Sequence, residues 1–459
     1  MLPERFVAAL RDAIGGGAVR SDPASLERAS ADALGIAHLP DLVVVPAATA
    51  GVSAIARLCH EHRVPLVVRG AGTGYTGGAV PTAGGVVLSM ERMNRIREID
   101  EANLLAVVEP NVVTADLQCA VERVGLFYPP DPASLETSSI GGNVAECAGG
   151  PRAFKYGTTK RYVLALEAVL AGGEVVRTGS RAVKSVVGYD LTQLFVGSEG
   201  TLAIITEVTL RLVPLPPARA TLSASFADVT RACDAVTGLI RRRVVPAAVE
   251  IVDGASLRAV EAYTGRDVSG GGEALVIVEC DGAAAAVEEE MALVREACEA
   301  AGAATMTRAT TDAARADLWS VRRRLSLALR ATGLRKINHD VAVPRARIPE
   351  LFAILDELRR EWQLQIAAFG HAGDGNIHVN LLIDPGDADA RVKAAAAERR
   401  LFERVVALQG SISGEHGIGF AKAPYLDVEL SADTIALMRR IKAACDPHGI
   451  LNPGKIFPS

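Results

Sequence analysis

The sequence lacks closely spaced cysteines. Its seven cysteines are scattered, and no Cys-x-x-Cys pair occurs, which excludes a zinc ribbon and a cysteine-ligated iron–sulfur cluster. Dispersed single cysteines are typical of a reducing compartment. We therefore expect a cytoplasmic protein, and leave peripheral membrane association open.

Long apolar runs and an excess of basic charge are also missing. No stretch of about 18 apolar residues is present, so we expect no transmembrane segment. Charged residues such as Glu4, Arg5, Arg11 and Asp12 interrupt the N-terminal segment, which argues against a signal peptide. The 49 basic and 54 acidic side chains give a net charge of −5, which supplies no basic face for a nucleic-acid partner.

The composition is that of a globular protein of two or three domains. The chain has 459 residues, of which 49% are hydrophobic, enough for each domain to bury its own core. Its 43 glycines show no three-residue period, so a collagen-like fold is excluded. We expect the glycines to serve turns or a close approach of the backbone to a ligand.

The order of predicted elements divides the chain in two. Residues 1–35 are predicted to form an amphipathic helix, and short β-branched runs around a helix at 48–62 then indicate a β-α-β start. Pro216–Pro217 indicates a domain boundary. Beyond it, strands and long helices alternate in a pattern that is not simply parallel, with strands predicted at 335–343, 365–370 and 376–383.

A glycine-rich loop follows an early predicted strand. Gly72, Gly74 and Gly77 form a literal Gly-x-Gly-x-x-Gly, the fingerprint of nicotinamide dinucleotide binding. That fold needs a helix directly after the loop, whereas residues 78–85 contain three glycines and a proline and cannot propagate one. A nicotinamide dehydrogenase is therefore disfavoured, and a loop that binds phosphate through backbone N–H groups is expected.

Two further glycine-rich segments, 138–150 and 195–210, also lie beside predicted strands. Three such loops in one domain favour a single extended ligand of dinucleotide length. A catalytically silent subunit with such a ligand remains an alternative at this point.

A histidine pair flanks a predicted tight turn. Asp374–Gly375 is a strong signal for a two-residue type I′ turn, and pairing outward from it places His371 opposite His378, with Asn380 on the same face. Two imidazoles so placed can chelate a metal ion. Glu415 and His416, between glycines, offer further ligands, and two histidines with one carboxylate are typical of a catalytic metal site. A metal-dependent hydrolase without the dinucleotide is the alternative.

Seven segments of the sequence resemble the flavoproteins of the vanillyl-alcohol oxidase (PCMH) type. The resemblance is to the branch of FAD-dependent D-lactate dehydrogenases, D-2-hydroxyglutarate dehydrogenases and the glycolate oxidase flavoprotein subunit. The segments, in the family's order, are RGAGTGYTGGAVP (69–81), PPDPASLETSSIGGNVAECAGG (129–150), KYGTT (155–159), GYDLTQLFVGSEGTLAIITEVTLRL (188–212), GHAGDGNIH (370–378), SGEHGIG (413–419) and LNPGK (451–455).

The resemblance implies an α+β fold. It consists of a bipartite FAD-binding domain of the PCMH type (1–217) with an inserted α/β substrate cap domain (218–420) that bears the metal site, and a C-terminal segment (421–459) that returns to the FAD domain. The residues implied for FAD are Arg69, Gly70, Ala71, Gly72, Thr73, Gly74, Gly77, Gly78, Ala79, Pro130, Ser134, Ser139, Gly142, Asn143, Gly149, Tyr156, Gly157, Gly200, Ile204, Ile205, Asn452 and Lys455.

The first loop holds no histidine, so the resemblance implies that FAD is bound non-covalently. Three positions depart from the family pattern: Glu146 stands where Asn is usual, Tyr75 where Leu or Val is common, and Asn111 where Gly is common. These departures bear on contact details and leave the expectation of FAD unchanged.

The resemblance also implies a reaction. His371, His378 and Glu415 match the ligands of a divalent metal, zinc or manganese, and His416 matches a general base, a role for which an imidazole suits neutral pH. The expected reaction oxidises a small (D)-2-hydroxy acid to the 2-oxo acid by hydride transfer to flavin N5. Asn380, Arg322 and Lys336 are expected to contact the substrate; for Arg322 the reason is that its planar guanidinium matches a carboxylate. His339 is expected to be structural.

D-Lactate or glycolate is the favoured substrate, and the alternatives are a D-2-hydroxyglutarate dehydrogenase or the flavoprotein subunit of a multi-subunit glycolate oxidase. The electrons must leave to an external acceptor, which is a quinone, a cytochrome, an electron-transfer flavoprotein or an iron–sulfur subunit. A homodimer is left open.

Overall fold

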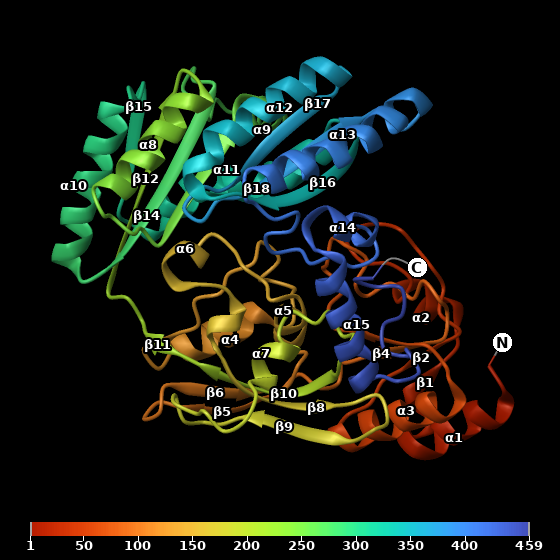
Figure 1. The fold of residues 1–459 in the computed structure, drawn as a ribbon. Helices are drawn as coiled ribbons and strands as arrows, with labels where there is room; N and C mark the ends of the chain where they lie inside the picture. The colour runs from red at the N-terminus through yellow and green to blue at the C-terminus, as the bar shows by residue number, and fades with distance from the viewer. Residues whose placement is uncertain (1, 458–459) are drawn as a thin grey trace. The chain divides into compact units, whose positions relative to one another are not determined.

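The computed structural model describes residues 2–457, which form two compact units (Figure 1). The first unit comprises the residues up to Gly149, Thr158–Leu215 and the residues from Glu415 onward, and the second comprises Gly150–Gly157 and Pro216–Gly414. The chain therefore passes between the units at four points. The units differ from the expected division at 217 and 420. Residues 415–420, expected in the cap domain, belong to the first unit, and the short segment 150–157 was not expected in the second unit.

A small, mainly parallel sheet begins the first unit. Its strands run in the order β1 (Val19–Arg20), β2 (Leu42–Val44), β4 (Val86–Ser89) and β3 (Leu66–Arg69). Strand β4 pairs in parallel with β2 and β3, and the helix between β2 and β3 is α3 (Thr49–His62). This arrangement confirms the predicted β-α-β start. Leu66, Val86 and Leu88 lie in the core with Val52 and Ile55 of α3.

The single helix predicted over 1–35 is wrong. The structure instead has α1 (Glu4–Ile14), the short β1 and α2 (Pro23–Arg28). Gly15 adopts a φ of 85° at the end of α1, and Gly16 and Gly17 follow it. Consecutive glycines stop a helix because they lose the most backbone entropy in it.

An antiparallel sheet of five strands completes the framework of the first unit. The strand order is β5 (Ile96–Asp100), β6 (Leu105–Val108), β10 (Ile204–Arg211), β8 (Val163–Val169) and β9 (Val175–Gly179). The other elements of the first unit are α4 (Thr114–Glu122), the pair β7 (Leu126–Phe127) and β11 (Val213–Pro214), α5 (Ile140–Glu146), α7 (Leu191–Phe195), α14 (Leu426–Glu429) and α15 (Ala432–Cys445).

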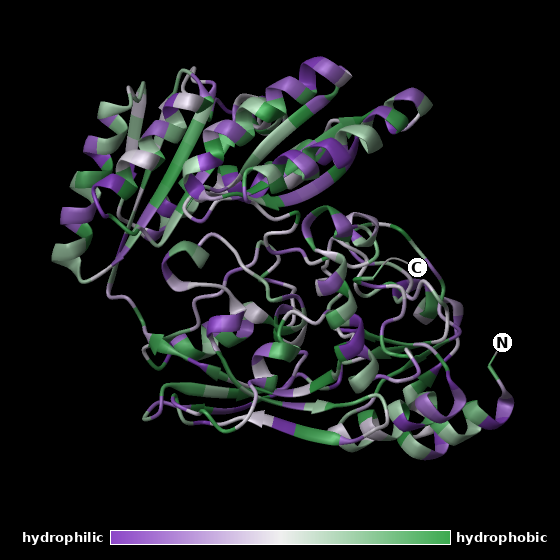
Figure 2. Ribbon diagram, viewed as in Figure 1, coloured by the Kyte–Doolittle hydropathy of each residue, from purple (hydrophilic) through white to green (hydrophobic). Residues whose placement is uncertain are grey.

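The second unit is built on an antiparallel sheet of seven strands. The order is β15 (Thr305–Ala309), β12 (Ala218–Phe226), β14 (Ala274–Gly282), β13 (Ala248–Asp253), β17 (Gln365–His371), β18 (Asn376–Ile383) and β16 (Arg335–Ala342). The sequence predicts β16, β17 and β18 to within one residue at each end. Most strands of both units are hydrophobic, whereas the helices alternate hydrophobic and hydrophilic residues (Figure 2), as expected of strands covered by amphipathic helices.

Helices cover the sheet of the second unit. Helices α9 (Gly254–Thr264) and α11 (Asp312–Ala331) share a core with β13 and β14, in which Leu257 and Leu325 join Val252, Leu275 and Ile277. The remaining long helices contact one another as neighbours, α10 with α8, α8 with α12, and α12 with α13. These are α8 (Val229–Arg241), α10 (Ala284–Ala300), α12 (Ile348–Trp362) and α13 (Ala388–Ala407).

The α+β fold class is confirmed by the sheets of the two units and their helices. Within residues 2–457, none of the helices has the length and apolar character needed to cross a lipid bilayer.

Candidate active site

One face of the seven-stranded sheet collects polar side chains. The register pairs Glu250 with His371, His378 with both Phe369 and Asp340, and Asn380 with both Ala367 and Asn338. Because alternate residues of a strand share a face, these residues lie on the face of Phe369 and Leu382, which pack against α9 and α11. The apolar residues of α11 pack on the apolar part of this sheet face. The paired polar residues lie on the same face beside that apolar part.

The predicted register of the histidine hairpin is wrong by two residues. His371 pairs with Asn376, and His378 pairs with Phe369, so four residues rather than two connect the strands. Gly375 has a φ of 92°, whereas Asp374 is not among the residues with positive φ, and a type I′ turn requires positive φ at both central positions. A shift of two residues preserves the face, and the imidazoles of His371 and His378 remain neighbours, with ring centroids 5.3 Å apart.

His371 is held by a buried carboxylate. Its Nδ1 contacts Glu250 Oε1, and Arg322 Nε of α11 donates to Glu250 Oε2. Burial alone raises the pKa of Glu250, but its interactions with His371 and Arg322 outweigh burial and hold the pKa below its usual value. The guanidinium of Arg322 also lies over the ring of Phe369, 4.7 Å from its centroid.

A second buried carboxylate, Asp340, organises the loop that leads to Glu415. Asp340 accepts hydrogen bonds from Asn376 Nδ2 (2.6 Å) and from the backbone N–H of Gly414 (2.9 Å). Its Oδ1 lies 3.8 Å from His378 Nδ1. Glu415 and His416 follow Gly414 directly, so the covalent chain itself keeps them within reach of Asp340.

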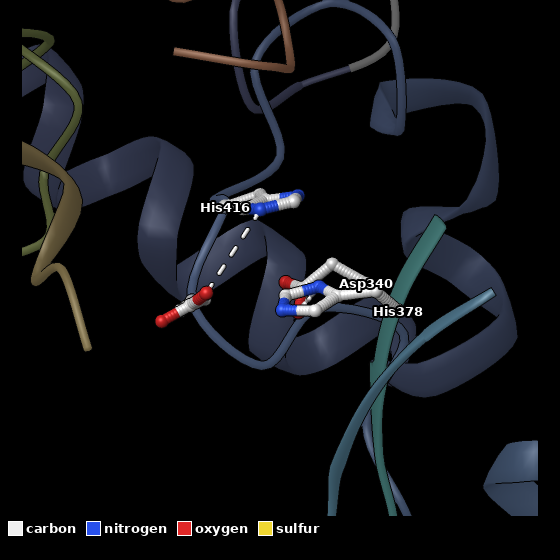
Figure 3. Close-up of side chains that lie close together, drawn as sticks. Asp340, His378 and His416 are labelled. Carbon is white, nitrogen blue, oxygen red and sulfur yellow. Dashed lines mark ion pairs between the residues drawn. The ribbon is translucent and has the colours of Figure 1, made fainter. Parts of the chain in front are cut away.

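Asp340, His378, Glu415 and His416 each offer one ligand atom, and these atoms lie within 4.8 Å of one another. His416 Nε2 lies 4.0 Å from Glu415 Oε1 (Figure 3). Figure 3 also shows Asp340 and His378 side by side. Imidazoles with carboxylates suit a divalent transition metal, so the donor set fits such an ion. Of the predicted ligands, His378 and Glu415 belong to this group, whereas His371 lies beside it.

The residues predicted to contact the substrate differ in their present hydrogen-bond partners. The Asn380 amide donates to the carbonyls of Ala367 and His378, and its oxygen accepts from Asn338, so a substrate contact would require one of these bonds to exchange. Lys336 Nζ donates to Ser326 Oγ. His339, on the other face of β16, packs its ring edge-on against Phe402 and lies 3.6 Å from Glu398, in agreement with a structural role.

In the first unit, His416 is oriented by the glycine-rich loop. Its imidazole stacks on Tyr75 with ring centroids 5.2 Å apart, and its carbonyl accepts from Thr76 Oγ1. Glu199 accepts from the N–H groups of Ile418 and Gly419. The segment after the candidate metal ligands is thus bound to loops that the sequence predicts for the cofactor.

The first glycine loop fits an anionic ligand. Among residues 2–457, the backbone N–H groups of residues 70–74 find no hydrogen-bond acceptor, which leaves five consecutive donors for phosphate oxygens. A side chain at two of the glycines would clash with a neighbour, since a Cβ on Gly70 would lie 2.3 Å from Ser139 Oγ and one on Gly77 would lie 2.0 Å from the Phe420 ring.

Two other predicted cofactor segments of the first unit, at residues 139–143 and 452–455, contact this loop. Asn452 Nδ2 donates to the carbonyls of Gly78 and Glu199, and Lys455 Nζ donates to the carbonyl of Val80. Ser139 caps α5, and Asn143 Nδ2 donates to Thr114 Oγ1. The predicted cofactor residues that belong to the first unit are residues 69–74, 77–79, Pro130, Ser134, Ser139, Gly142, Asn143, Gly149, Gly200, Ile204, Ile205, Asn452 and Lys455.

Tyr156 and Gly157 belong instead to the second unit. Tyr156 OH donates to Asp281 Oδ2 (2.7 Å), and Lys155 Nζ donates to Asp281 Oδ1 (2.6 Å). A cofactor contact from these two residues stays a prediction.

Glu146, which departs from the family pattern, is a buried acid beside the first glycine loop. Its Oε1 lies 2.8 Å from the position of a Cβ on Gly78. Burial, with the charges of Glu199 and Asp32, raises its pKa well above the usual value. Of the described residues, Glu146 Oε2, Asp32 Oδ2 and Asn452 Oδ1 are buried polar atoms without a hydrogen-bond partner. Such atoms line a loop that fits a polar ligand.

Sequence reasoning missed Glu250 and Asp340. The alternation of polar residues along a strand could have indicated Asp340. Lys336, Asn338 and Asp340 are every second residue of β16 and therefore share one face. Glu250 is a charge flanked on both sides by apolar residues within β13, which is unusual because a buried charge needs partners. Those partners come from α11 and β17 and are not visible in the sequence.

Comparison with known proteins agrees with this geometry. Residues 215–456 match the model for the C-terminal domain of FAD linked oxidases, and residues 40–179 match an FAD binding domain. The chain is 42% identical to the glycolate oxidase subunit GlcD of Bacillus subtilis (91% of this chain, 89% of that protein) and 39% identical to the D-lactate dehydrogenase of Archaeoglobus fulgidus (90% and 91%).

The fold is also that of a p-cresol methylhydroxylase, with a TM-score of 0.81 at 19% identity over 99% of this chain and 97% of that chain. From the matched domains and these relatives, the chain belongs to the FAD linked oxidase family.

Proposed function

We propose that the protein is an FAD- and divalent-metal-dependent dehydrogenase that oxidises a small (D)-2-hydroxy acid, D-lactate or glycolate, to the 2-oxo acid. The observation that supports this most is the polar face of the seven-stranded sheet: it bears Asp340 and His378, which belong to the group able to hold a metal, together with Lys336. Arg322 of α11 contacts Glu250 on the same face. Relatives named as a glycolate oxidase subunit and a D-lactate dehydrogenase support the substrate class.

Each of the chain's own groups has a distinct role in this proposal. His378 and Glu415, with His371, hold the metal, and the N–H groups of the first glycine loop hold the FAD pyrophosphate. Arg322 and Lys336 bind the substrate carboxylate, because both are cations on one face of the second unit. When bound, the flavin supplies a hydride acceptor and the divalent ion a Lewis acid. His416 accepts the hydroxyl proton, and its stacking on Tyr75 limits its orientation.

Anaerobic mixing of the purified protein with substrates tests this function. We expect visible absorption bands of bound flavin that bleach with D-lactate or glycolate, and about one divalent metal per chain by elemental analysis. Bleaching by D-2-hydroxyglutarate alone would select the dehydrogenase of that acid instead. A protein without flavin bands, or one whose flavin none of these acids reduces, would refute the proposal. Re-oxidation by a quinone, a cytochrome or an electron-transfer flavoprotein then identifies the class of acceptor.

Lys336 predicts a pH dependence of substrate binding. Burial, and then the nearby charges of Arg330 and Arg322, lower its pKa to about 8. Below that pH the ammonium attracts an anionic substrate, and above it the charge is lost. The KM should therefore rise with pH above about 8, by up to about tenfold one unit higher. Lys336→Arg keeps the charge, so KM measured at constant ionic strength should stay flat in that variant; an equal rise in both proteins would contradict the prediction.

A further inference from the structure

Glu250 is a buried charge whose partners are all residues of the proposed site. It is fully buried in the centre of the seven-stranded sheet. Among the described residues its side chain has two partners, His371 Nδ1 on Oε1 and Arg322 Nε on Oε2. Burying a carboxylate is costly unless its partners satisfy it, and here each oxygen is committed to one predicted functional residue.

Two different elements bring these partners to Glu250. His371 lies directly opposite Glu250 in the pairing of β13 with β17, so the sheet register fixes that contact. Arg322 comes from α11, whose Leu325 and Leu329 pack on the same face of the sheet. The position of the carboxylate is therefore set by the core of the second unit.

We propose that Glu250 is the positioning residue of the active site, orienting the imidazole of His371 through one oxygen and the guanidinium of Arg322 through the other. The inference rests on the proposed function, which gives His371 to the metal and Arg322 to the substrate carboxylate. One carboxylate would then couple metal binding and substrate binding.

The chemistry of the two partners explains how the coupling operates. When Nδ1 of a neutral imidazole donates its proton to a carboxylate, the lone pair lies on Nε2, the atom that then binds a metal, and such partners raise metal affinity. Arg322 is held through Nε, and its flat face lies over Phe369. Its two terminal amino groups are therefore the ones presented to a substrate carboxylate.

Asp340 does not play the same part for His378. The 3.8 Å between Asp340 Oδ1 and His378 Nδ1 is too long for a hydrogen bond. The Asp340 oxygens accept instead from Asn376, Ser413 and Gly414. Of the two buried carboxylates, Glu250 orients a histidine and Asp340 anchors a loop.

Glu250→Gln is the test variant, because Gln keeps the shape but cannot accept from both His371 and Arg322. Glu279→Gln is the matched control. Glu279 is a buried carboxylate of the adjacent strand β14 that accepts from Thr221 and from Trp319 of the same helix α11. We expect Glu250→Gln to weaken zinc or manganese binding by about 10–100-fold and to raise the KM for the 2-hydroxy acid, while Glu279→Gln changes neither.

The position of the His371 proton can be measured on the metal-free wild-type protein by NMR, without an activity assay and without the Glu250 variant. With ¹⁵N-labelled histidine, the His371 signal, assigned by its loss in His371→Asn, should show the proton on Nδ1. A proton on Nε2 instead would overturn the inference, as would wild-type metal affinity and KM in Glu250→Gln. A wild-type protein that shows the Nδ1 proton but binds no divalent ion would refute the metal in the proposed function and leave the positioning by Glu250 supported.

Discussion

Loss of 2-hydroxy-acid oxidation with retention of the flavin is the expected result of replacing His378 or Glu415 by alanine. Both residues belong to the group whose ligand atoms lie within 4.8 Å. Removing a charge-stabilising ligand from such a site is expected to lower kcat by about 10²–10³-fold or more. The predicted FAD residues include neither His378 nor Glu415, so the flavin absorption should not change. Turnover is measured with an artificial electron acceptor, and bound metal by elemental analysis.

His339→Ala is the matched control for His378→Ala. His339 is also a buried histidine of the same sheet, next to Asp340 in sequence, but it faces Phe402 and Glu398 on the other side. Its replacement should lower the melting temperature and leave kcat and metal content near those of the wild type. Unchanged turnover in His378→Ala and Glu415→Ala would refute a metal-dependent mechanism.

The second large effect is expected from His416→Asn. A positioned general base contributes about 10²–10⁴-fold to the rate, and asparagine cannot accept the hydroxyl proton. Flavin content should stay at the wild-type level. Metal content should fall less than in Glu415→Ala if His416 acts as the base rather than as a ligand.

The rate of flavin reduction by substrate, followed by anaerobic stopped flow, isolates the chemical step for this variant. Tyr75→Phe serves as a control, since it keeps a ring for His416 to stack on. Reduction of the flavin at the wild-type rate in His416→Asn would show that another group takes the proton. Loss of metal equal to that in Glu415→Ala would assign His416 to the ligand set.

Local sequence by itself determined the strands, the glycine loops and the type of chemistry. Strands β16, β17 and β18 lie within one residue of their predicted bounds. The N–H groups of residues 70–74, which have no acceptor within residues 2–457, lie in a loop too rich in glycine to continue as a helix. The common face of His371, His378 and Asn380 follows from strand periodicity and from a pairing register that differs from the predicted one by an even number of residues. These features depend on neighbours in the chain, so local patterns predict them.

The tertiary structure decided the register and the partners. The loop after His371 is four residues long because Asp374 does not adopt the positive φ of a type I′ turn, and no local signal indicated this. Glu250 meets Arg322 across 72 residues of sequence, and Asp340 meets Gly414 across 74. A buried carboxylate is stable only where hydrogen-bond donors or cations lie next to it. Sheet order and helix packing bring these partners together, and the sequence pattern does not specify either.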